Sequence, residues 1–417
     1  MVKSILFSKI IIFTLITLLI AINNVQSKET ILKKSSNIIL NGNTLYVGGS
    51  GLGNYSNIHD AIKNASDGDT VFVFNGIYSA NIVIDKSISL IGEDQDNTII
   101  EGESNGFLIS VDYVKIMKFT IQKCGGFWHH SGIYVGSDHN TISHVSITNN
   151  GVLNGIFLEY SSDNIITDTT IKNNKYNGIR LDYSYYNTIV GNLVSNIITN
   201  GISLTSSSNN EIYSNTLKEC SHSGISICCS SEDNKLYHNN LINNDLSNGY
   251  DECNNFWDND YPSGGNFWDD YAGVDADGDG IGDTPYPISG GINEDRYPLM
   301  KPYGSPEIPV IKGPANGRVG KKYTYTFECI DPREDNIYYY IDWDDGTNSG
   351  WLGPYKSGLM INLSHSWNKK DVYIIKAKSK NTKDLESEWG EKEINIPRNK
   401  TTNNLLFRFL NSWFYYF

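Results

Sequence analysis

Acidic side chains with the spacing of a cation-binding loop fill one short segment of this 417-residue chain, residues 266–283. Asp275, Asp277 and Asp279 occupy alternate positions, and Asp283 follows four residues after Asp279. Gly280 permits the sharp turn, and the carbonyl of Ile281 would supply a backbone ligand. Hard cations such as calcium take several oxygen ligands that converge from one loop. The pattern predicts a structural calcium site, and a solvated acidic turn is the alternative.

A second group of reactive side chains comprises Glu159, Arg180 and Asp182, which stand in neighbouring copies of a repeated segment. Two carboxylates on adjacent strands would lie about 5 Å apart. This is close to the separation of the two carboxyl groups in retaining glycosidases, and Arg180 resembles the basic residue of polysaccharide lyases. An exposed salt-bridge cluster on a sheet is the alternative for the same residues.

Aromatic residues surround these three candidates and would offer rings for stacking on sugars. They are Trp128, Tyr134, Phe157, Tyr160 and Tyr183. The chain lacks the spaced Asp motifs of a polygalacturonase, and no Lys accompanies Arg180 as in a pectate lyase. Binding of a polysaccharide is therefore favoured over its cleavage.

A repeat organises the segments that carry these residues. Gly-Ile steps recur every 23 residues, at Gly132-Ile133, Gly155-Ile156, Gly178-Ile179, Gly201-Ile202 and Gly224-Ile225. A repeat of this length suits one coil of a solenoid, whose apolar positions stack on those of the next coil. Alternation after each Gly points Ile179 and Leu181 inward and Arg180 outward. The sequence thus predicts a parallel-stacked β-solenoid.

A second short strand is expected in every coil, with two further apolar columns. One column comprises Ile142, Ile166, Ile189, Ile212 and Leu236, and the other Ile147, Ile171, Val194, Leu217 and Leu241. Asparagines also align from coil to coil, at Asn140, Asn164, Asn187, Asn210 and Asn234. Stacked amides can bond along such a column, so we interpret them as structural turn ladders.

These repeats resemble the right-handed parallel β-helix of the NosD-like and carbohydrate-binding/sugar-hydrolase (CASH) families. The segment NIHDAIKNASDGDTVFVFNGIY, residues 57–78, resembles the amphipathic helix and first strand that cap such spirals. The resemblance implies a capped β-helix over residues 45–250 and a C-terminal capping segment, with the Asp-rich loop, over residues 251–300. The loop itself resembles those of dockerins and thrombospondin type 3 repeats.

The composition changes from Ser305 onward to short strands separated by turns. Residues 305–397 resemble PKD-type and related immunoglobulin-like modules, which implies a small β-sandwich. An apolar tail follows at residues 398–417, and residues 403–417 are too short to span a bilayer. Interfacial membrane attachment, contact with a protein partner and a poorly ordered end remain alternatives for it.

The N-terminus predicts export. Lys3 and Lys9 precede an apolar run and a small-residue cleavage site, so residues 1–27 are expected to form a signal peptide. An uncleaved N-terminal anchor is the alternative, although the apolar run is short for a bilayer span. The formal net charge of −14 argues against nucleic acid as a partner. Six cysteines permit disulfides in an exported protein. A local bridge is possible among Cys220, Cys228, Cys229 and Cys253, whereas Cys124 and Cys329 are expected to be buried.

Three hypotheses follow for a secreted or cell-surface protein. The first is a β-helix that binds a polysaccharide or cell-envelope glycan, or builds the envelope, without catalysis. The second is a polysaccharide lyase or glycosidase acting at Glu159, Arg180 and Asp182. The third is a NosD-like copper accessory protein. Copper sites gather Met, Cys or His ligands, whereas Met117, Met300 and Met360 are not clustered in the sequence, which argues against copper delivery.

Overall fold

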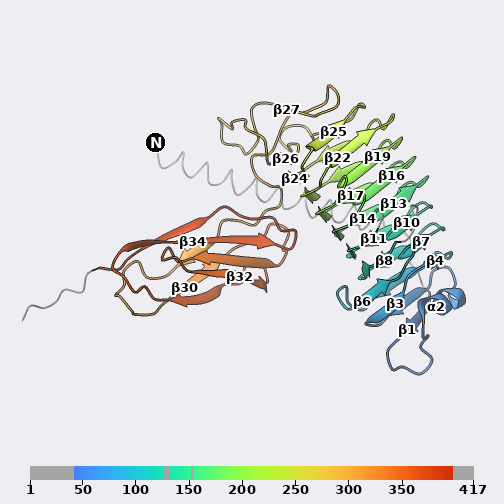
Figure 1. Cartoon of the computed structure of the whole chain (residues 1–417), viewed down its shortest axis with the longest axis horizontal. Helices are drawn as coiled ribbons and strands as arrows, with labels where there is room; N and C mark the ends of the chain where they lie inside the picture. Colours follow the sequence, from blue (N-terminus) through green and yellow to red (C-terminus); the bar gives the residue numbers. More distant parts are fainter. Residues whose placement is uncertain (1–41, 126–130, 152–153, 398–417) are drawn as a thin grey trace, which may run out of the picture. The chain divides into compact units, whose positions relative to one another are not determined.

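The computed structural model describes residues 42–125, 131–151 and 154–397. The chain forms two compact units that divide between Tyr303 and Gly304. The first unit is a stack of short parallel strands, and the second contains two antiparallel sheets (Figure 1). This architecture confirms the expected all-β fold, a parallel β-helix followed by a small β-sandwich.

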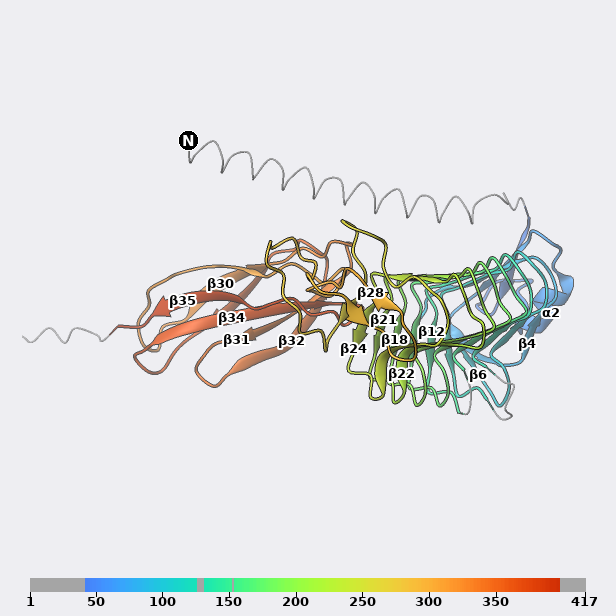
Figure 2. The same ribbon diagram turned by 90° about the horizontal axis from the view of Figure 1, so that it is seen from above.

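Each complete coil contributes one strand to each of three parallel sheets, and Figure 2 shows the coils stacked on one another. Sheet 1, which follows the Gly-Ile steps, comprises β4 (Ile82–Ile84), β7 (Phe107–Ile109), β10 (Ile133–Val135), β13 (Ile156–Glu159), β16 (Ile179–Asp182), β19 (Ile202–Thr205), β22 (Ser223–Cys228) and β25 (Ser247–Asp251). Sheet 2 comprises β1 (Thr44–Val47), β2 (Thr70–Val73), β5 (Ser89–Gly92), β8 (Lys115–Met117), β11 (Thr141–Ser143), β14 (Ile165–Thr167), β17 (Thr188–Val190), β20 (Glu211–Tyr213) and β23 (Lys235–Tyr237). Sheet 3 comprises β3 (Gly76–Ser79), β6 (Thr98–Glu101), β9 (Thr120–Gln122), β12 (Ser146–Thr148), β15 (Thr170–Lys172), β18 (Leu193–Ser195), β21 (Thr216–Lys218), β24 (Asn240–Ile242) and β26 (Phe267–Trp268).

The Gly-Ile signature follows from how closely the coils approach one another. Ile179 and Leu181 are fully buried, as the alternation predicted, and stack in register on the same positions of the adjacent coils. A Cβ added at Gly178 would lie 2.3 Å from the Val194 side chain and 2.5 Å from the Gly201 carbonyl oxygen. Only glycine therefore fits before each inward-pointing isoleucine.

The prediction of a single further strand per coil is wrong, because the chain turns a corner within it. Asp168, with a φ of 50°, lies between β14 and β15. The equivalent corners also have positive φ, at His144, Gly191, Ser214 and His238. A residue in the left-handed region redirects the strand. The columns of Ile142 and Ile147 therefore belong to two different sheets, sheet 2 and sheet 3.

The predicted asparagine column forms a buried ladder of side-chain amides. Asn164 donates from Nδ2 to Oδ1 of Asn187 at 3.1 Å, and Asn187 donates in the same way to Asn210 at 3.0 Å. A second ladder, which the sequence analysis missed, comprises Asn192, Asn215, Asn239 and Asn266. Because buried amides need partners, these ladders confirm a structural role for the asparagines.

Both ends of the solenoid are covered. Helix α2 (Ile58–Asn64) begins at Asn57, whose side chain accepts from the Asp60 N–H, and buries Ile58, Ala61 and Ile62. At the other end, Trp257 and Trp268 extend the apolar core beyond the last coil. Two short antiparallel strands belong to this end, β27 (Tyr286–Pro287) and β28 (Glu294–Asp295).

The second unit has a core of its own that includes Trp343 and Trp367. One antiparallel sheet comprises β29 (Val310–Lys312), β30 (Tyr323–Glu328) and β33 (Ile361–His365), and the other β31 (Ile337–Asp342), β32 (Asn348–Tyr355), β34 (Val372–Asn381) and β35 (Gly390–Asn395). Within the described ranges, no helix has the length and apolar character needed to cross a membrane. The predicted signal peptide and apolar tail lie outside the described residues.

Candidate ligand-binding face and metal sites

A column of side chains follows the end of sheet 1, where each strand leaves the sheet. In-register pairing places four strand-terminal residues side by side, Glu159, Asp182, Thr205 and Cys228. Glu252 continues this end column, because Ile227 pairs with Asp251 immediately before it. Neighbouring members are one strand spacing apart, about 4.8 Å. The three catalytic candidates therefore lie within or beside a single continuous column.

Arg180 occupies both oxygens of one candidate carboxylate. Its Nε donates to Oδ1 of Asp182 at 2.8 Å, and its Nη2 donates to Oδ2 at 2.7 Å. This hydrogen bonding raises the pKa of Arg180. The guanidinium also lies over Phe157, 5.4 Å from the ring centroid. Phe157 is only 8% exposed, so it does not offer the stacking surface that the sequence predicted.

The second candidate carboxylate is bound by a tyrosine. Tyr134 donates from its hydroxyl to Oε2 of Glu159 at 2.7 Å, and its ring meets Phe157 edge-on with centroids 5.7 Å apart. Burial first, and then the hydrogen bond to Glu159, raise the pKa of Tyr134 to about 12. Tyr134 is thus a neutral donor at ordinary pH. Both carboxylates already have side-chain partners, as in a surface cluster.

Tyr160 and Tyr183 are the exposed aromatic residues next to the end column of sheet 1. Their rings stack with centroids 4.9 Å apart and planes within 7°, and they are 69% and 45% exposed. Each follows the end-column residue of its own strand and has a positive φ, 51° and 49°. Non-glycine residues adopt this conformation rarely, and for a bulky residue it carries strain. Two adjacent coils thus hold large rings in strained turns that leave ring surface open to solvent.

The predicted binding residues therefore divide into three groups. Two hydrogen-bonded pairs, Tyr134–Glu159 and Arg180–Asp182, lie on adjacent strands and form a polar cluster beside the stacked Tyr160–Tyr183 pair. Phe157 lies beneath that cluster, covered by Arg180. Trp128 lies outside the described residues. The polar cluster and the stacked pair are called the sheet 1 face below.

The Asp-rich loop brings three of its four predicted acids together. Carboxylate oxygens of Asp275, Asp277 and Asp279 lie within 4.8 Å of one another. Asp275 accepts from the N–H groups of Gly278 at 2.7 Å and Gly280 at 2.9 Å, and such bonds outweigh desolvation and lower its pKa.

Asp283, the fourth predicted acid, does not belong to this cluster of three carboxylates. It accepts from the Ala276 N–H at 2.9 Å, which ties the two arms of the loop together. The N–H of Ile281, whose carbonyl was the predicted backbone ligand, donates to Asp279 at 2.8 Å. The role of all five residues as metal ligands stays a prediction.

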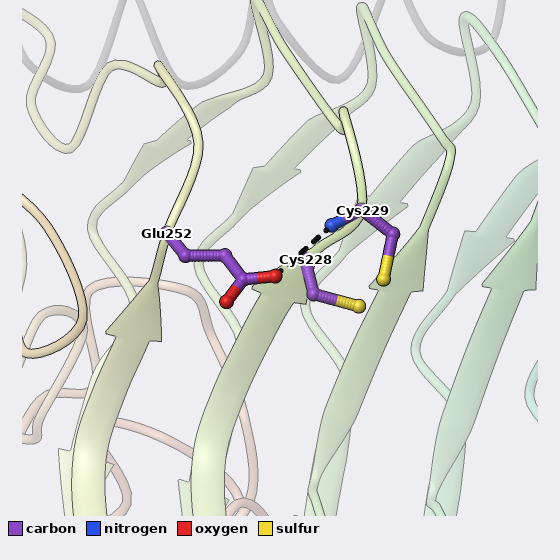
Figure 3. Close-up of side chains that lie close together, drawn as sticks. All are labelled: Cys228, Cys229 and Glu252. Carbon is purple, nitrogen blue, oxygen red and sulfur yellow. Dashed lines mark hydrogen bonds between the residues drawn. The ribbon is translucent and has the colours of Figure 1, made fainter.

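The sequence analysis missed a second cluster at the far end of the end column. Ligand atoms of Cys228, Cys229 and Glu252 lie within 4.8 Å of one another, and Figure 3 shows them converging from adjacent coils. All six cysteines are free thiols, so the local disulfide that the spacing permitted is not formed. Glu252 follows Cys228 by 24 residues, about one coil, and this spacing was the available signal.

These features define an exposed face of polar and aromatic side chains on a parallel β-helix protein. The chain belongs to the NosD family, whose sequence model, described as periplasmic copper-binding protein (NosD), matches residues 62–273. A search of the curated proteins gave no match.

Solved structures resemble parts of the chain. It is similar to the PKD domain of an M14-like peptidase from a Thermoplasmatales archaeon, with 47% identity over 22% of this chain and 97% of that chain and a TM-score of 0.22. Pectate lyase Pel9A has 13% identity over 56% of this chain and 76% of its own, with a TM-score of 0.44. An alginate lyase from Paenibacillus has 16% identity over 54% of this chain and 97% of its own, with a TM-score of 0.29.

Proposed function

We propose that this protein is exported to the cell surface and binds a polysaccharide on the sheet 1 face without cleaving it. The observation that carries the proposal is the exposed, stacked pair Tyr160–Tyr183 beside a row of polar side chains. A rigid aromatic surface stacks on sugar rings at a small entropic cost. The neighbouring carboxylates and hydroxyls offer hydrogen-bond partners for sugar hydroxyl groups.

Export is supported by two independent features. The chain belongs to a family described as periplasmic, and Lys3 and Lys9 precede an apolar segment typical of a secretory signal. A role in building the envelope is compatible with the same location. The exposed tyrosine pair favours binding, because neighbouring rings that are 69% and 45% exposed form an aromatic surface that a purely structural turn does not require.

Charge favours a neutral polysaccharide over an acidic one. Glu159 and Asp182 lie side by side on adjacent strands, and Arg180 is already paired with Asp182. The whole chain carries a formal charge of −14. A uronic acid would meet repulsion here, whereas the hydroxyls of a neutral sugar donate hydrogen bonds to carboxylates.

A lyase or glycosidase is the second candidate, because the paired positions of Glu159 and Asp182 match the spacing of two catalytic carboxylates. The bidentate pairing of Asp182 with Arg180 works against it, since a base or nucleophile must reach its substrate. Neutral and acidic polysaccharides should be screened for retention, with parallel assays for reducing sugars and unsaturated products. Retention of a neutral glycan without product supports binding, and turnover that disappears in Glu159→Gln would establish the enzyme instead.

The proposal includes a structural calcium ion bound by the Asp-rich loop. The three clustered carboxylates of Asp275, Asp277 and Asp279 repel one another when no cation is bound. A hard divalent cation takes such oxygens readily. Bound there, calcium would order the segment that follows the coils, which has few regular strands of its own.

A further inference from the structure

Two cysteines and a glutamate meet at the far end of the end column. The Sγ atoms of Cys228 and Cys229 and a carboxylate oxygen of Glu252 all lie within 4.8 Å of one another. In Figure 3, Cys228 ends its strand, Cys229 follows in the turn, and the Glu252 carboxylate extends from the next coil towards them. The three donors therefore come from two stacked coils.

The backbone of the solenoid fixes this arrangement. Cys229 has a φ of 63°, which turns the chain directly after Cys228. The Cys229 N–H donates to Oε1 of Glu252 at 3.3 Å, and its carbonyl accepts from the Ser206 hydroxyl at 3.0 Å. Each coil thus constrains the next, so the donors are positioned before any ligand arrives.

Neighbouring hydroxyls support the donor atoms from the outside. Thr205 Oγ1 lies 3.9 Å from Sγ of Cys228, and Tyr250 donates to Oε2 of Glu252 at 3.4 Å. Metal ligands are commonly oriented by such outer hydrogen bonds. The hydroxyls of Thr205 and Tyr250 thus orient the Cys228 thiol and the Glu252 carboxylate, and leave lone pairs on both for a metal ion.

We propose that Cys228, Cys229 and Glu252 form a binding site for a zinc ion, with a water molecule completing the coordination. Zinc accepts thiolate and carboxylate ligands together and favours four ligands in a tetrahedron. Tetrahedral zinc places two sulfur ligands about 3.7 Å apart, and the ligand atoms here already lie within 4.8 Å of one another. Coordination would also protect exposed thiols from oxidation.

The mixed donor set separates zinc from other metals. Calcium and magnesium take oxygen ligands and have little affinity for sulfur. Copper(I) prefers soft sulfur donors and gains little from a carboxylate. The carboxylate of Glu252 beside two thiols therefore favours a borderline-soft ion such as zinc. A site for copper(I) would be expected to contain sulfur ligands alone.

The test uses the full chain, kept reduced, with cobalt(II) as a spectroscopic probe and zinc as the competitor. One cobalt per chain should bind and give thiolate-to-metal absorption that zinc abolishes. Cys228→Ser and Cys229→Ser should each weaken zinc binding by about 100-fold or more, and Glu252→Gln by about tenfold or more. Copper(I) affinity, measured against a colorimetric chelator, should be unchanged in Glu252→Gln.

Cys253→Ser is the matched control, because this thiol follows Glu252 directly but lies outside the three-residue cluster. It should leave zinc affinity unchanged. Absence of thiolate–cobalt absorption in fully reduced protein would overturn the proposal. So would a Cys228–Cys229 disulfide that persists under reductant, or copper(I) binding with no affinity for zinc.

Discussion

Arg180 and Asp182 stand two residues apart on one strand and face the same way, joined by two hydrogen bonds of 2.8 and 2.7 Å. The pair turns what could be a catalytic carboxylate into part of a fixed polar surface. Bidentate arginine–carboxylate pairs have a rigid geometry, so the groups of this surface are held in fixed positions.

Leu181→Asp should destabilise the solenoid by about 3 kcal/mol or more, because an unpaired charge would be buried between two coils. Ser203→Asp is the matched control, since Ser203 points outward and pairs with Arg180 in the register. It should change stability little. Denaturant unfolding of both variants measures the difference, and equal losses would refute the assigned faces.

Asn187→Ala should cost about 2 kcal/mol or more, because it leaves buried donors and acceptors on two neighbouring coils without partners. Asn196 offers a control, since its amide bonds to Asn173 on the exposed surface. Asn196→Gly keeps the left-handed backbone possible and should be nearly neutral. Similar losses at both positions would show that burial of the ladder is unimportant.

The periodic parts of this fold were predictable from sequence, and the parts set by neighbouring side chains were not. Ile179, Leu181 and the Asn187 column follow directly from the repeat, since stacking forces each coil to copy the last. The corner at Asp168 escaped prediction because a non-glycine residue in the left-handed region has no strong sequence signature. The burial of Phe157 depends on where Arg180 lies, which spacing alone does not specify.

Acidity should stabilise the end of the solenoid through Asp295. Burial raises the pKa of this carboxyl to about 7, whereas an unfolded aspartate has a pKa of about 4. The folded state thus binds the extra proton, so this contribution is fully present below about pH 4 and is lost as the pH rises through about 7. Unfolding of wild type and Asp295→Asn from pH 4 to 8 tests it. If the free energy of unfolding changes with pH in the same way in Asp295→Asn as in the wild type, Asp295 is not the group responsible.

Removing calcium should loosen residues 266–300 while the coils persist, because stacked repeats draw stability from their nearest neighbours. Limited proteolysis with and without chelator should show new cleavage there. Asp277→Asn combined with Asp279→Asn should abolish the difference between the two conditions. Asp342→Asn, in the second unit, should not. Identical cleavage of the wild-type chain in both conditions would leave only a solvated acidic turn.

Polysaccharide binding at the sheet 1 face is tested by measuring how tightly the Tyr160→Asn and Tyr183→Asn variants bind a neutral polysaccharide that the wild-type protein retains. Asparagine tolerates the positive φ of both positions, so the backbone should persist while the stacking surface is lost. The control is Tyr237→Ala, which removes one member of another stacked pair, Tyr213–Tyr237 on sheet 2. We expect about tenfold or greater weakening of binding in the first two variants, with unchanged melting temperatures, and wild-type affinity in the control. Wild-type affinity in all three variants would contradict binding at the sheet 1 face.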